Sequence, residues 1–77
     1  MSEKYLSQLS EGESCTVKSL EISGAMRYRL NELGFINGCD VMCLQNNFSG
    51  NMTAYFVRGA VIALRRSETS RIKIAVP

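Results

Sequence analysis

The stretch MRYRLNELGFING, residues 26–38, decides the fold of this 77-residue chain. Leu30 and Leu33 share a helix face with Met26, at i, i+4 and i+7 spacing. Gly34 follows at once, where a helix would end in the left-handed conformation that glycine adopts without a Cβ penalty. An Asn-Gly turn and an apolar run with strand character come next. A short helix within a chain of strands indicates a small barrel with a helical insert and no active site.

Strands are predicted both before and after this helix in the sequence. The helix itself is expected over residues 24–33, with Ser23 as its N-cap. Alternating apolar and polar residues or short apolar runs predict five strands, over residues 14–20, 38–45, 52–58, 60–65 and 72–76. A hairpin loop rich in turn formers is expected over residues 46–51, and a polar helical turn over residues 66–70. This order fits a mainly β, partly open barrel with the helix inserted between strands 1 and 2.

The strand at residues 38–45 is apolar on both faces. Cys39, Val41 and Cys43 point one way, and Met42 and Leu44 point the other. We therefore expect both faces to be covered, one by the barrel interior and the other by the helix. If the second face were uncovered, Met42, Leu44 and Phe56 would offer a surface for a dimer.

Composition indicates one small domain that spans residues 1–77. Apolar residues make up 45% of the chain, as in a folded globular protein. The formal charge is +2, from nine Lys and Arg against seven Asp and Glu, which is too mild to predict nucleic-acid binding. The longest apolar run covers residues 60–64, far short of the roughly 20 residues of a membrane span. The sequence predicts a soluble protein of the cytoplasm.

Metal ligation has little support among the residue types present. The chain lacks histidine, and its three cysteines are Cys15, Cys39 and Cys43. On a strand, Cys39 and Cys43 would have Cα atoms about 13 Å apart, too far for both to hold one ion. Free cysteine behaves as a small buried hydrophobe, so we interpret the cysteines as core residues and assign no metal or cofactor ligand.

Catalysis and nucleic-acid binding are also disfavoured. The single aspartate, Asp40, has no evident carboxylate partner, and without a histidine base we expect no enzyme activity. Arg58, Arg65, Arg66 and Arg71 could cluster at one end of the barrel. Few aromatic residues accompany them, so we interpret them as a solvated rim and expect no nucleic-acid partner.

Three segments carry a resemblance to a known family. The run RxRLxELGFIxG at residues 27–38 resembles the helix and turn of the ferrous iron transport protein A family. The run VRGxxIALR at residues 57–65 resembles its second signature, and ExxxIxI at residues 68–74 resembles its ending. The resemblance covers residues 9–76 in order and spacing. The chain departs from the family in lacking a proline in the loop at residues 46–51 and in having Thr69 where alanine is frequent.

The resemblance implies a fold, a compartment and a partner. The fold is an SH3-like barrel, and the compartment is the bacterial cytoplasm. The role is that of an accessory protein beside the membrane ferrous iron permease, ferrous iron transport protein B, which carries a cytosolic GTP-binding region. Weak transition metal ion binding stays open, and the chain is expected to be a monomer or a weak homo-oligomer. The alternatives are a metal-responsive domain like the carboxyl-terminal SH3-like domain of metal-dependent repressors, and a small nucleic-acid-binding barrel.

A partner-binding surface is predicted from exposed residues. The helix should carry Arg27, Arg29 and Asn31 away from its apolar stripe, and Phe48 lies in a polar loop where a large apolar side chain is unusual. Exposed Phe and Arg are frequent interface anchors. We therefore predict that these four residues contact the partner, with a folded-back Phe48 as the alternative.

Overall fold

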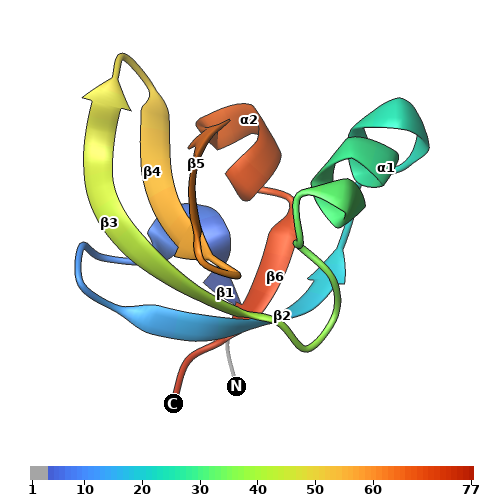
Figure 1. Ribbon diagram of the computed structural model, residues 1–77, viewed down its shortest axis with the longest axis horizontal. Helices are drawn as coiled ribbons and strands as arrows, with labels where there is room; N and C mark the ends of the chain where they lie inside the picture. Colours follow the sequence, from blue (N-terminus) through green and yellow to red (C-terminus); the bar gives the residue numbers. More distant parts are fainter. Residues whose placement is uncertain (1–3) are drawn as a thin grey trace.

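The computed structural model describes residues 4–77, apart from the side chain of Phe48. Antiparallel strands form a six-stranded sheet in the order β1-β6-β2-β3-β4-β5, which curls into a partly open barrel (Figure 1). The strands are β1 (Lys4–Tyr5), β2 (Ser14–Leu20), β3 (Asp40–Ser49), β4 (Met52–Val57), β5 (Ala60–Arg65) and β6 (Ile72–Ala75). The helical segments are the 3-10 turn η1 (Leu6–Gln8), α1 (Gly24–Glu32) and the single turn α2 (Arg66–Thr69). The predicted mainly β barrel, with a helix between its first two long strands, is confirmed.

Two features of the sheet differ from the prediction. The sequence analysis missed β1, which pairs with β6 through Lys4 opposite Ile74. The predicted loop at residues 46–51 is also wrong in part, because β3 continues to Ser49. Shifts in the β3–β4 register allow β3 to be longer than β4. Asn47 of β3 takes a positive φ of 53°, which asparagine tolerates better than most residues.

The core fills the inside of the curled sheet. β4 turns Tyr55 and Val57 inward, and the Tyr55 hydroxyl donates a hydrogen bond to the carbonyl oxygen of Leu6 at 3.4 Å. This bond fixes η1 across one end of the barrel. The largest fully buried side chains include Leu6, Val17, Leu30, Phe35, Val41, Tyr55, Val57, Leu64 and Ile72.

Helix α1 stands beside the barrel and covers little of the sheet (Figure 1). Ser23 precedes α1 in an extended conformation, but its side chain makes no capping hydrogen bond, contrary to expectation. The helix ends at Glu32, one residue before the predicted end, and Gly34 takes the predicted left-handed conformation with a φ of 105°. The amide of Phe35 donates to the carbonyl oxygen of Leu30 at 2.9 Å. Of the helix residues only Leu30 is fully buried, while Met26 is 36% exposed. The predicted apolar stripe is therefore buried only at the carboxyl end of α1.

The outer face of β3, β4 and β5 is uncovered, contrary to the sequence expectation. Met42 is 38% exposed, Leu44 40%, Phe56 43% and Val61 66%. At the carboxyl end of α1, Leu30 and Phe35 pack into the core at the edge of the barrel. The helix therefore does not reach the outer face of β3. No helix in the described residues is long and apolar enough to cross a membrane.

Candidate functional site

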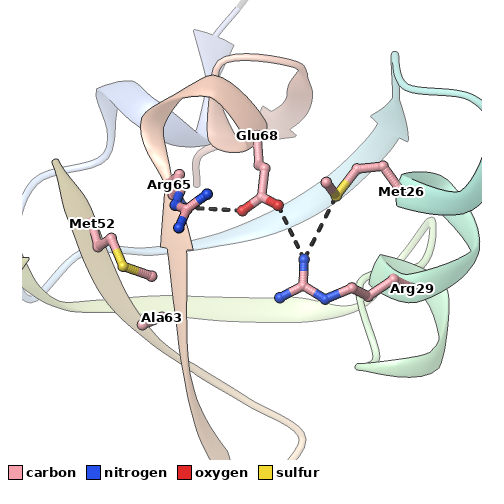
Figure 2. A pocket seen from close by; sticks show the side chains of 6 residues that line it. All are labelled: Met26, Arg29, Met52, Ala63, Arg65 and Glu68. Carbon is pink, nitrogen blue, oxygen red and sulfur yellow. Dashed lines mark hydrogen bonds and ion pairs between the residues drawn. The ribbon is translucent and has the colours of Figure 1, made fainter.

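A cleft lies between α1 and the β4–β5 hairpin. Its volume is about 290 Å³. Figure 2 shows the β4–β5 hairpin on one side of the cleft, α1 on the other and Glu68 of α2 between them. The lining residues are Met26, Arg29, Met52, Ala63, Arg65 and Glu68.

Local structure sets the direction of each lining side chain. Met26 and Arg29 are three residues apart on α1, so they lie on the same side of the helix. Met52 and Arg65 are directly opposite each other in the β4–β5 ladder, and Ala63 is two residues before Arg65 on the same face of β5. The cleft therefore combines a small apolar wall with two guanidinium groups.

Glu68 is the buried polar residue that connects the walls of the cleft. Its side chain is only 10% exposed. One carboxylate oxygen, Oε2, accepts a hydrogen bond from Arg29 Nη1 at 3.1 Å, and the other, Oε1, accepts one from the backbone amide of Arg65 at 3.0 Å. Arg29 Nη1 also lies 3.6 Å from the sulfur of Met26 (Figure 2). One carboxylate of α2 thus joins α1 to the end of β5.

The outer part of α1 is held mainly by arginine side chains. Arg27 Nη1 donates to the carbonyl oxygen of Leu20 at 3.4 Å, and Arg29 binds Glu68. Apolar anchoring comes from Leu30 at the carboxyl end, next to the half-buried Leu33. The width of the cleft at α1 therefore depends on the ion pair between the half-exposed Arg29 and the buried Glu68.

Two of the three thiols, Cys15 and Cys43, lie in the sheet, Cys39 directly precedes β3, and none of them lines this cleft. Cys15 pairs with Val41, which places Cys43 two residues further along β3 as its diagonal neighbour. Cys15 and Cys43 are buried and Cys39 is partly buried, so the interpretation of the cysteines as core residues is confirmed for the first two and holds in part for the third. Burial raises the pKa of Cys15 to about 11. In residues 4–77 no three His, Cys, Asp or Glu side chains are grouped so that they could hold a metal ion.

The predicted partner-binding residues on α1 have different surroundings in the structure. Arg29 lines the cleft beside Met26 and points toward Glu68, so its predicted direction away from the apolar stripe of the helix is wrong. Arg27 contacts the end of β2, and Asn31 is exposed on α1. The side chain of Phe48 lies outside the described part of the structure.

Of the residues that line the cleft, only Arg29 was among the predicted site residues. Met52 and Ala63 carry no local signal of a site, because only the folding of the hairpin beside α1 brings them to it. One signal was available in the spacing of Arg65 and Glu68. A Glu three residues after the position that precedes a helix can accept a hydrogen bond from that position's amide, which Glu68 does.

The curled sheet, its end closed by η1 and its helix standing to one side define an SH3-like domain. The chain belongs to the FeoA family, since the model of the FeoA domain matches residues 4–76. No curated protein sequence matches the chain.

Solved structures agree with this membership. The iron(II) transport protein A of Clostridium thermocellum is 29% identical over 95% of the chain, with a TM-score of 0.89, and the chain spans 45% of that protein. FeoA of Stenotrophomonas maltophilia, solved with zinc and described as a prokaryotic SH3 domain protein, is 30% identical over 94% of this chain and 89% of its own, with a TM-score of 0.81. A manganese-dependent transcriptional repressor shares the fold at 15% identity, with a TM-score of 0.88 over the whole chain and 38% of the repressor. The predicted SH3-like fold is therefore confirmed.

Proposed function

We propose that this protein is a cytoplasmic accessory factor in ferrous iron uptake that binds the cytosolic GTP-binding region of the membrane ferrous iron permease. Its membership of the FeoA family supports the link to iron transport. The observation that carries the mode of action is the cleft between α1 and the β4–β5 hairpin. A small barrel with such a cleft is suited to holding part of another protein.

The chemistry of the cleft favours binding over catalysis. Met26 and Met52 offer flexible thioether side chains that adapt to the shape of a bound surface. Arg29 and Arg65 offer guanidinium groups, which are frequent anchors at interfaces. The carboxylate of the cleft, Glu68, is already bonded at both oxygens and is poorly placed to act as a general base.

A titration with the partner tests this function. The soluble GTP-binding region of the permease from the same organism is added to ¹⁵N-labelled protein, and amide chemical shifts are followed. We expect saturable changes around Arg29, Ala63 and Arg65. The variant Arg29→Gln should bind about tenfold more weakly. Lys18→Gln is the matched control, because it removes the same charge from an exposed position on β2.

Two outcomes would contradict parts of the proposal. Absence of any saturable shift would reject binding to the permease. Shifts confined to Arg27, Asn31 and the loop around Phe48 would move the contact to the surface predicted from sequence and away from the cleft.

Metal responsiveness is a second candidate function. It is favoured by the zinc in the structure of the Stenotrophomonas maltophilia relative. In this chain Cys15 and Cys43 are buried in the sheet and burial raises the pKa of Cys15, so any transition metal ion should bind weakly at neutral pH. Calorimetry with zinc tests this, and a dissociation constant below about 1 μM would contradict the expectation.

A further inference from the structure

Strand β5 is a free edge of the sheet. It pairs with β4 on one side, and the strand order of the described residues ends at β5. An edge strand presents a row of backbone donors and acceptors to whatever lies beside it.

The hydrogen-bond pattern identifies which groups of β5 face outward. The amide of Arg66 donates to the carbonyl oxygen of Asn51 at 3.1 Å, so this opposed pair is a hydrogen-bonded one. Such pairs alternate along an antiparallel ladder. Leu64 and Ile62 therefore bond to β4, whereas the backbone groups of the residues between them point away from β4.

The outward-pointing residues of β5 are Val61, Ala63 and Arg65. The amide of Arg65 confirms this direction, because it donates to Glu68 of α2 and not to β4. Glu68 thus satisfies the last outward donor of the strand. The backbone groups of Val61 and Ala63 point to the side of β5 that pairs with no strand of the described residues, and such a row can bind a short extended chain.

The free edge opens into the cleft. Ala63 lines the cavity, and the opposite wall is made by Met26 and Arg29 of α1 (Figure 2). Because α1 forms the opposite wall, the cleft suits a single extended segment better than the sheet of a second folded domain. The cationic residues Arg29 and Arg65 outnumber the one carboxylate, Glu68, so an acidic residue on the segment would be favoured.

An exposed apolar row ends at the same edge. Met42, Phe56 and Val61 are directly opposite one another across β3, β4 and β5, and Val61 is 66% exposed. A strand added to β5 would extend this row and place apolar side chains beside Val61. It would also cover Ile62, which is only partly buried on the inner face.

We propose that the cleft binds an extended segment of the partner as an additional strand along β5. The segment is apolar at its centre and acidic near Arg29 and Arg65, and its backbone bonds to Val61 and Ala63. This inference rests on the proposed function, since the segment belongs to the cytosolic region of the permease.

Amide hydrogen exchange in the free and bound protein tests the proposal. In the free protein the amides of Val61 and Ala63 should exchange fast, while those of Ile62 and Leu64 are slow. Binding of the soluble GTP-binding region of the permease should slow Val61 and Ala63 at least about tenfold and leave Ile62 and Leu64 unchanged. No other binding mode predicts this alternation along one strand.

A pair of variants at one position checks the backbone contact. Ala63→Pro removes the outward donor without removing a β4 bond, and proline is tolerated on such edges. Binding should weaken about tenfold. Ala63→Ser keeps the donor and should bind within about threefold of the unchanged protein. If Ala63→Pro fails to fold, the exchange pattern of the unchanged protein still decides the question.

The outcomes separate the two proposals. Binding with no added protection at Val61 and Ala63 would overturn strand addition and leave the proposed function standing. No binding at all would overturn the proposed function and this inference with it. Protection that appears at Val61 and Ala63 in the protein alone, as its concentration rises, would identify a second copy as the occupant and overturn the assignment to the partner.

Discussion

Gly34 meets two separate structural requirements. Its φ of 105° lies in a region that residues with a Cβ rarely adopt. The side chain of Arg58 also crosses this site, so that a Cβ at Gly34 would stand 2.5 Å from Arg58 Cδ. The same glycine therefore ends α1 and accommodates the turn between β4 and β5.

Replacing this glycine should destabilise the fold through the backbone. We expect Gly34→Ala to lower the free energy of unfolding by about 1–2 kcal/mol, measured by urea denaturation. The double variant with Arg58→Ala removes the close contact but keeps the strained φ. It should recover little of the loss, and full recovery would assign the effect to the contact instead.

Buried thiol and phenol groups predict an alkaline loss of stability. Burial raises the pKa of Cys15 from its ordinary 9.0 to about 11 and that of Tyr55 from 10.0 to about 12. The unfolded chain releases these protons first, so the contribution of Cys15 is complete below pH 9 and is lost as the pH rises to about 11. The urea midpoint should fall over this range. Cys15→Ala should be less stable at pH 8 but show a shallower fall, and an equal slope in both proteins would contradict the assignment.

At the scale of the elements, strand periodicity was the part of the fold most readable from sequence. The predicted strands at residues 14–20 and 60–65 match β2 and β5 at both ends, because their apolar and polar residues alternate or are bounded by turns. β1 was missed because two residues carry no period. The position of α1 could not be read either, since its periodicity shows which residues are apolar and not which surface they meet.

Adjacent residues of β4 should respond differently to substitution. Phe56 points outward and is 43% exposed, whereas Val57 is buried. We expect Phe56→Thr to cost under about 1 kcal/mol of stability and Val57→Ala about 2 kcal/mol, measured by urea denaturation. Similar costs at both positions would mean that the outer face of the sheet is covered in solution.

The attachment of α1 should depend on Glu68. Glu68→Ala removes the bonds to Arg29 and to the amide of Arg65, and we expect a loss of about 1–2 kcal/mol. Glu68→Gln keeps an acceptor for that amide but loses the ion pair, so its cost should be smaller. Amide exchange in α1 should become faster in both variants. Unchanged exchange in α1 would show that Leu30 alone holds the helix.

At the scale of the whole molecule, the cleft exists only because distant segments meet. Arg29 and Glu68 are 39 positions apart, and no local pattern pairs them. Arg29 was expected to point away from the apolar stripe of the helix but points into the cleft, because the curl of the sheet decides which side of α1 faces the barrel. The chemical types of the cleft residues were visible in the sequence, and their meeting point was not.

The position of the chain ends allows a test of the topology. β1 and β6 are antiparallel neighbours, with Lys4 opposite Ile74. A permuted chain, joined by a short Gly-Ser linker and opened in the turn at Gly50, should fold with the same amide spectrum. Loss of the native spectrum would mean that the β3–β4 connection must be intact for folding.

The β1–β6 pairing also bears on how such a domain is built into longer proteins. Because the first and last strands run side by side in opposite directions, both flanking segments leave from neighbouring points of the barrel. A second domain can therefore be fused there with a short tether and without altering α1 or β5. This arrangement allows the barrel to be joined to other domains. In agreement, the same fold makes up 38% of the chain of a transcriptional repressor.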